Sequence, residues 1–182
     1  SGEPFTIPPN LYLIGTMNTA DRSIALVDAA LRRRFRFLSF PPDLDIVRTE
    51  YGYDSWDAVA MDATTTGDAM LRARTFIAAH QLNAKIRAEP DLGRGKQIGH
   101  SFLFGLDDTA DIVNTWRFEI LPLLEEYFFG QYSRIQDTLF NGNGSELFDW
   151  EHQQIRSFDE TALEEALKPF VEAFDPDDPG IN

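Results

Sequence analysis

Residues 10–40 of the 182-residue chain read NLYLIGTMNTADRSIALVDAALRRRFRFLSF, and the rest of the sequence is organised around this stretch. The apolar run at residues 11–14 follows two prolines and predicts a short buried strand. Polar and charged residues crowd residues 16–23, at the carboxyl end of that strand, where ligands bind in open α/β sheets. Residues 24–31 have helical spacing, and residues 35–40 predict a second strand that ends at a Pro-Pro pair.

Three arginines, Arg32, Arg33 and Arg34, end the expected helix. Cations are favoured near a helix C-terminus by the helix dipole, so part of this cluster has a purely structural explanation. Arginine also presents a planar fork that fits phosphate oxygens, which makes the cluster a candidate phosphate contact. Because successive helical residues point about 100° apart, the three side chains cannot share one target. We expect Arg33 and Arg34 to act at a subunit interface, whereas Arg32 is a candidate with a solvated alternative.

Two motifs in this stretch carry a resemblance to a known family. Residues 17–23 (MNTADRS) and residues 28–35 (DAALRRRF) resemble the AAA+ NTPases, and closely the McrB type, the GTP-hydrolysing motor subunit of modification-dependent (methylcytosine) restriction systems. The first motif resembles the McrB-type signature loop, and the second resembles the helix-end arginine motif of AAA+ proteins. Similarity to McrB-like helical lids continues at residues 98–102 and 120–128.

The resemblance implies catalytic roles around the signature loop. Asn18 would hold the attacking water or sense the γ-phosphate, because a carboxamide both donates and accepts hydrogen bonds; the alternative is an Asn that only forms a turn. Asp21 would be catalytic and Arg22 would reach the nucleotide or the next subunit, unless the two side chains simply pair with each other. One of the helix-end arginines would be a finger that acts in trans, in a ring that is usually a hexamer.

The phosphate-binding elements of such NTPases do not occur in this sequence. There is no GxxxxGK[ST] phosphate loop (Walker A), and no apolar strand ends in Asp-Glu to hold Mg (Walker B). Residues 92–97 contain Gly and Lys, but their spacing is wrong. In the AAA+ order both elements come before the strand at residues 11–14. The chain alone is therefore expected to be inactive and to hold neither NTP nor Mg, whereas the parent protein would bind GTP or ATP with Mg.

Helical patterns dominate the remainder of the chain, at residues 68–88, 108–129 and 131–140. A short strand is expected at residues 101–104. Pro122 should kink the second helix or mark the end of a segment. A capping box at residues 157–160 predicts a last helix, in which Pro169 should cause a kink or a stop.

The expected fold is an α/β remnant plus an α-helical bundle, which is the C-terminal part of an AAA+ P-loop NTPase core with its helical lid. Residues 1–42 would be the end of the α/β core, with the sensor strand, the arginine-bearing helix and the last strand. Residues 43–174 would be the helical lid, and residues 175–182 an acidic tail. In the lid, His100 follows Gly99 and could face a nucleotide or a neighbouring subunit; the alternative is a packing turn.

Composition narrows the possible functions. The net charge is −14, from 30 acidic and 16 basic residues, which argues against broad binding to nucleic-acid phosphates. There is no cysteine and there are three histidines, so we expect no metal ligand in this chain. No run approaches the ~20 apolar residues of a membrane span, and no signal peptide is evident, so we expect a cytoplasmic protein.

Three functions remain open from the sequence. The first is the sensor, arginine-finger and lid portion of a McrB-like motor that drives a McrC-type nuclease partner and meets DNA only through other domains. The second is a piece of a MoxR-like AAA+ remodelling ATPase. The third is a non-enzymatic helical interaction module.

Overall fold

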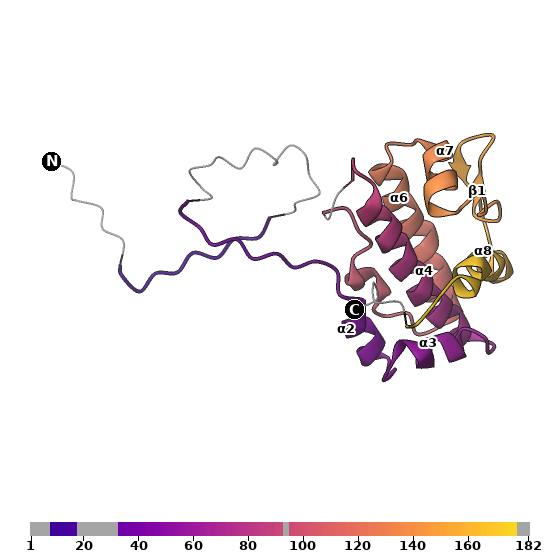
Figure 1. Ribbon diagram of the computed structural model, residues 1–182, viewed down its shortest axis with the longest axis horizontal. Helices are drawn as coiled ribbons and strands as arrows, with labels where there is room; N and C mark the ends of the chain where they lie inside the picture. The colour runs from indigo at the N-terminus through magenta and orange to yellow at the C-terminus, as the bar shows by residue number, and fades with distance from the viewer. Residues whose placement is uncertain (1–7, 18–32, 93–94, 178–182) are drawn as a thin grey trace. The chain divides into compact units, whose positions relative to one another are not determined.

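The computed structural model describes residues 8–17, 33–92 and 95–177 of the chain. The chain divides into two units, Ser1–Leu38 and Ser39–Asn182, and each is described by itself. The second unit is largely helical and is named the helical unit (Figure 1). No helix within the described ranges is long and apolar enough to cross a membrane.

In chain order, the described elements are the α-helices α2 (Leu44–Glu50), α3 (Trp56–Asp62) and α4 (Asp68–Ala88), the 3-10 helix η2 (His100–Leu103), α5 (Thr109–Thr115), the π-helical turn η3 (Trp116–Ile120), α6 (Leu121–Tyr127), α7 (Tyr132–Arg134), the π-helical turn η4 (Ile135–Leu139), the strands β1 (Phe148–Asp149) and β2 (Gln154–Ile155), and α8 (Glu160–Glu172). The two strands pair antiparallel. The sequence did not predict this hairpin.

The two strands expected within residues 1–42 are not formed. Residues 11–14 and 35–40 have no strand structure, so both predictions are wrong for this structure. Their apolar side chains face solvent; Ile14 is 93% exposed and Phe40 is 87% exposed. A strand needs neighbouring strands to satisfy its backbone N–H and C=O groups, and the described residues supply none for these segments. The helix expected at residues 24–31 lies outside the described residues.

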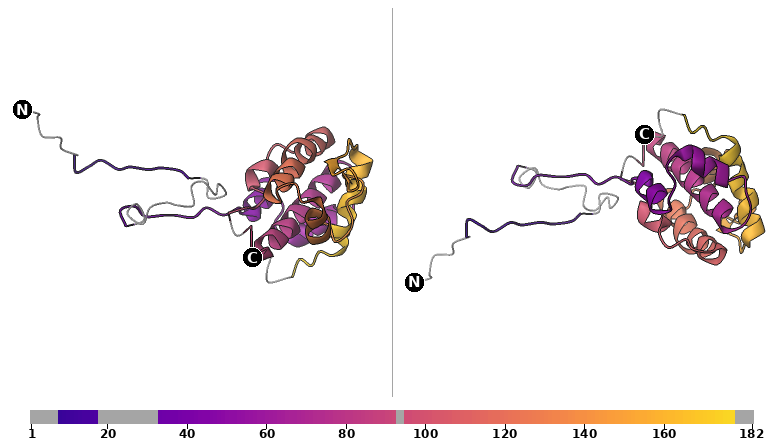
Figure 2. Two further views of the ribbon diagram at one scale, coloured as in Figure 1. Left: turned by 90° about the horizontal axis from the view of Figure 1, so that it is seen from above. Right: turned by 90° about the horizontal axis from the view of Figure 1, so that it is seen from below.

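The longest helix, α4, has the bounds that the sequence predicts. All five positions of its predicted apolar stripe, Leu71, Thr75, Ala78, Leu82 and Ile86, are buried. The helix contacts α2, α3, α5, η4 and α8, so it is the central helix of the unit. In both views of Figure 2, α8 (yellow) lies at one side of the helical unit. Buried residues cover most of its circumference, as expected for a core helix rather than a surface helix.

The predicted second long helix is present as the continuous run α5–η3–α6. Its middle is a π turn, in which the Leu121 N–H donates to the carbonyl of Trp116, five residues earlier. The turn precedes Pro122, whose missing N–H would interrupt a regular α-helical ladder. The run changes from the π turn to α6 at Leu121, one residue before Pro122, and continues through the proline. The extra residue in the turn rotates the face of α6, so Leu124 rather than the predicted Leu123 is fully buried.

A buried hydrogen bond links this run to the central helix. The indole Nε1 of Trp116 donates to Thr75 Oγ1 on α4 at 3.0 Å, and both residues are fully buried. The bond satisfies two polar groups that would otherwise be left unpaired inside the core. It fixes the register of η3 against α4.

The last helix, α8, corrects two predictions. Asp159, not Ser157, caps it, with Oδ1 accepting the Ala162 N–H at 3.0 Å. The chain stays extended before Asp159 because Phe158 is buried and its carbonyl accepts a bond from Arg117. The helix also continues through Pro169 to Glu172, so the stop predicted as one alternative at this proline is wrong. Burial of its apolar face against the core outweighs the one backbone bond that proline removes.

Candidate functional site

The structure describes three of the seven site residues that the sequence predicts. Asn18, Asp21, Arg22 and Arg32 all lie outside the described residues. Arg33 and Arg34 are described and exposed, in the unit that precedes the helical one. The roles of the signature loop and of the arginines therefore stay predictions.

His100 is the one predicted site residue that the helical unit contains. It begins η2, which replaces the strand predicted at residues 101–104, so that prediction is wrong. Its ring Nδ1 accepts the backbone N–H of Asp43 at 3.2 Å, across 57 positions of sequence. A nitrogen that accepts carries no proton, so this contact assigns the proton of the neutral ring to Nε2. His100 is half-buried, and its ring lies 6.2 Å from that of Phe104, centroid to centroid.

The loop that leads to His100 is held by side chains that sequence reasoning missed. Asn83 of α4 makes a pair of bonds to Ile98: its Nδ2 donates to the carbonyl at 3.0 Å, and its Oδ1 accepts the N–H at 2.6 Å. The hydroxyl of Tyr127 donates to the carbonyl of Gln97 at 3.0 Å. Asn83 is only 2% exposed. A polar residue inside a buried helical stripe is the signal that could have found it.

Lys96 is buried in the same loop. Its ammonium group lies 4.5 Å from the ring centre of Phe129 and 5.4 Å from that of Tyr127. Aromatic faces attract a cation at these distances. The lysine of this Gly-containing stretch thus packs against two aromatic rings.

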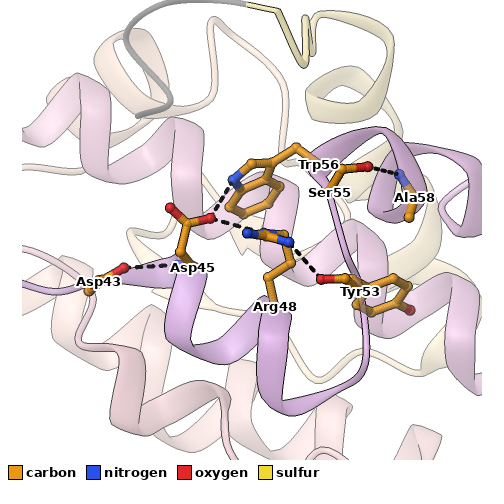
Figure 3. Close-up of polar contacts among 7 residues, drawn as sticks. All are labelled: Asp43, Asp45, Arg48, Tyr53, Ser55, Trp56 and Ala58. Atoms are coloured by element: carbon orange, nitrogen blue, oxygen red, sulfur yellow. Dashed lines mark hydrogen bonds and ion pairs between the residues drawn. The ribbon is translucent and has the colours of Figure 1, made fainter.

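The corner between α2 and α3 is held by a polar cluster around Asp45 (Figure 3). Oδ1 of Asp45 accepts from Arg48 Nε at 2.9 Å and from the indole Nε1 of Trp56 at 3.1 Å. Arg48 Nη1 also donates to the carbonyl of Tyr53 at 2.6 Å. Burial, and then the hydrogen bond to Asp62, raises the pKa of Tyr53 to about 12, so its hydroxyl remains a donor. The cluster joins the two helices and is structural.

The contacts described above position backbone segments. Asn83 and His100 each bond to main-chain groups. Across residues 8–17, 33–92 and 95–177, no group of three or more His, Asp and Glu side chains could hold a metal ion. What this part of the molecule can do is fix the start of α2, the loop before η2, and α4 relative to one another.

A comparison with protein families matches residues 77–136 to the alpha-helical lid domain of McrB. This region begins within α4, ends within η4, and includes Asn83, His100 and the π turn at Trp116–Ile120. The chain is also 40% identical, over 134 residues, to the type IV methyl-directed restriction enzyme EcoKMcrB subunit of Escherichia coli (strain K12). The match covers 70% of this chain and 27% of that relative, so the chain spans well under half of the relative's length.

These findings agree with the fold. The matched region is helical throughout its regular elements, as a helical lid requires. The resemblance that the MNTADRS and arginine motifs indicated is confirmed by a different part of the sequence. The chain is therefore McrB-type, and it carries the alpha-helical lid domain of McrB.

Proposed function

We propose that this chain is the sensor, arginine-finger and lid portion of a McrB-like restriction-system subunit that hydrolyses GTP or ATP with Mg. The observation that carries the proposal is the match of residues 77–136 to the McrB lid domain. The relative's name describes a subunit of a methyl-directed restriction enzyme, and we assign this chain to a system of that kind. A lid without a phosphate loop cannot hydrolyse NTP, so activity belongs to the parent protein.

The exposed apolar segments support the placement of residues 1–42 in an α/β core. Ile14 and Phe40 are almost fully exposed, and burying one such side chain is worth roughly 1.5–3 kcal/mol. Residues 11–14 and 35–40 would recover this energy, and pair their backbone groups, as strands of a sheet whose other strands lie elsewhere in the parent protein. That placement puts Asn18 at the carboxyl end of a strand, where it would orient the attacking water.

The partners are part of the same proposal. The parent assembles into a ring, a hexamer in proteins of this type, in which Arg33 or Arg34 reaches the γ-phosphate held by the neighbouring subunit. A McrC-type nuclease subunit is the partner, DNA is bound through other domains, and the system is cytoplasmic. The match to the McrB lid favours this function over a MoxR-like remodelling ATPase.

One observation favours a second candidate. The helical unit has a continuous hydrophobic core of its own, which suits a helical module that only assembles or docks. Phosphate release separates the two candidates. The parent protein, with a phosphate loop upstream, should hydrolyse GTP or ATP at about 1 s⁻¹ or faster, as ordinary enzymes do, whereas the purified 182-residue chain should release none.

Two results would contradict this proposal. A parent sequence without a GxxxxGK[ST] loop would favour the non-enzymatic module. Turnover by the chain alone, at a rate near that of ordinary enzymes, would show that its catalytic groups have been assigned wrongly.

A further inference from the structure

Asp43 lies near the start of the helical unit and makes two hydrogen bonds. Its carboxylate caps α2 by accepting the N–H of Asp45 at 3.0 Å. Its own backbone N–H donates to Nδ1 of His100 at 3.2 Å. The chain enters the helical unit at Ser39, four residues earlier. The two bonds therefore tie the first turn of the unit to η2.

The position of His100 is in turn set from the core. Two residues before it, Ile98 is fully buried, and both of its backbone groups bond to Asn83 of α4. A paired donor and acceptor hold the backbone of Ile98 in one orientation, and η2 begins directly after Gly99. A series of hydrogen bonds thus runs from the central helix, through Ile98 and His100, to Asp43.

We propose that His100 is a positioning residue, which holds the N–H of Asp43 so that α4 determines where the chain enters the helical unit. The imidazole does this as a neutral acceptor, with its proton on Nε2. The inference goes beyond the proposed function, because it needs no nucleotide, ring or partner. The contact lies inside the helical unit, and the contact with a nucleotide or a neighbouring subunit considered for His100 stays a prediction.

A matched pair of substitutions in the full chain tests the proposal. In His100→Asn, the amide oxygen takes the place of Nδ1 and can still accept the Asp43 N–H. In His100→Gln, the amide group takes the place of Nε2 and cannot accept the Asp43 N–H. The readout is hydrogen exchange at the Asp43 amide, measured by NMR. We expect exchange roughly fivefold faster in the Gln variant, the loss that one ordinary hydrogen bond implies, and close to the original rate in the Asn variant.

The amide of Ala58 is the control, because Ser55 caps it in α3, away from His100. Its exchange should be the same in both variants, which excludes general destabilisation. Equal exchange at Asp43 in the Asn and Gln variants, whether slow or fast, would overturn the proposal. This result would leave the proposed function untouched, just as a parent protein without NTPase activity would leave the role of His100 untouched.

The link to α4 has its own test. Asn83→Leu removes both bonds to Ile98 and keeps a side chain of similar size. If α4 positions His100, exchange at Asp43 should also accelerate in this variant. Faster exchange at Ile98 with an unchanged rate at Asp43 would show that His100 is positioned from elsewhere.

Discussion

Similar apolar side chains are exposed in the segment before the helical unit and buried in the helical unit itself. Ile14 lies in an apolar run and is 93% exposed, whereas Ile86, at the end of α4, is fully buried. Both belong to patterns that predict burial. A hydrophobic pattern says that a side chain gains by leaving water, but it buries nothing until a complementary surface is available. For α4 that surface is in this chain, and for residues 11–14 we propose that it is not.

The two regions also differ in net charge. Residues 1–38 contain five basic and three acidic residues, whereas residues 39–182 contain 11 basic and 27 acidic residues. A strongly acidic surface repels the phosphates of nucleic acids and nucleotides. The proposed phosphate contacts therefore belong to the arginines of the first region, while the helical unit offers positioning and packing.

The largest expected effect tests the first region in the parent protein. Arg33→Ala or Arg34→Ala should lower the rate of hydrolysis by roughly 10³ to 10⁵, which is what a finger in trans contributes. Arg36→Ala is the matched control, since it removes an equally exposed arginine from the same segment and should change the rate little. Phosphate release under saturating nucleotide is the measurement. Equal losses for all three variants would mean that the cluster acts only through its charge.

Mixing experiments separate the finger from the sensor. Subunits without the finger keep their own phosphate loop, so a phosphate-loop-dead subunit that still carries the finger should restore their activity. Asn18→Ala subunits should not be restored, because Asn18 is proposed to act on the water in its own subunit. If the arginine variants form rings but mixing restores nothing, the arginines revert to partners of the helix dipole.

The second effect compares the two isoleucines directly. Ile86→Ala should lower the free energy of unfolding by about 2–5 kcal/mol, because it leaves a cavity in the core. Ile14→Ala in the same chain should change it by no more than about 0.5 kcal/mol, as exposed positions do. Chemical denaturation followed by circular dichroism measures both. A large cost at Ile14 would show that its segment is packed in solution.

A smaller effect tests the corrected start of α8. Asp159→Ala removes the side chain that caps the helix and should cost about 1 kcal/mol. Ser157→Ala should cost close to nothing, because Ser157 makes no cap in the structure. The same denaturation experiment compares them. A larger cost at Ser157 would restore the capping box that the sequence predicted.

The smallest effect is a dependence on pH at the contact between α4 and α5. Asp68 accepts the hydroxyl and the N–H of Thr109, at 2.5 Å and 2.9 Å, and these bonds hold the pKa of Asp68 below its usual value of 3.8. The ionised carboxylate therefore stabilises the fold above about pH 4, and this contribution is lost as the pH falls through the lowered pKa.

Thr109→Val removes the hydroxyl bond and keeps the backbone bond. The pKa of Asp68 should rise towards 3.8, and the loss of stability in acid should become smaller. An NMR titration that follows the side-chain carboxyl carbons measures the pKa of Asp68. Asp149 is the internal control, because its pKa is lowered by His152 and Arg156 and should not respond. An unchanged titration of Asp68 would contradict the assigned cause.

The sequence by itself determined the family and the main helix. The MNTADRS loop and the arginine motif indicated the McrB type, because chemistry at a phosphate needs particular residues at particular spacing. The bounds of α4 were also predicted, since an apolar stripe of helical period runs unbroken between a glycine turn and a Glu-Pro stop. These signals depend only on residues that are close in the sequence, so they can be interpreted without knowledge of the fold.

Only the tertiary structure decided which local signals prevail. The capping box predicted at residues 157–160 places the cap of α8 at Ser157, but in the structure Phe158 is buried and Asp159 caps the helix. Proline at position 169 should interrupt a helix, yet the packing of α8 on α4 carries the helix through it. The roles of Asn83 and His100 were equally hidden, because each binds a backbone group 15 or 57 positions away. Such contacts form only when distant segments are brought together, and no periodicity within a single segment encodes them.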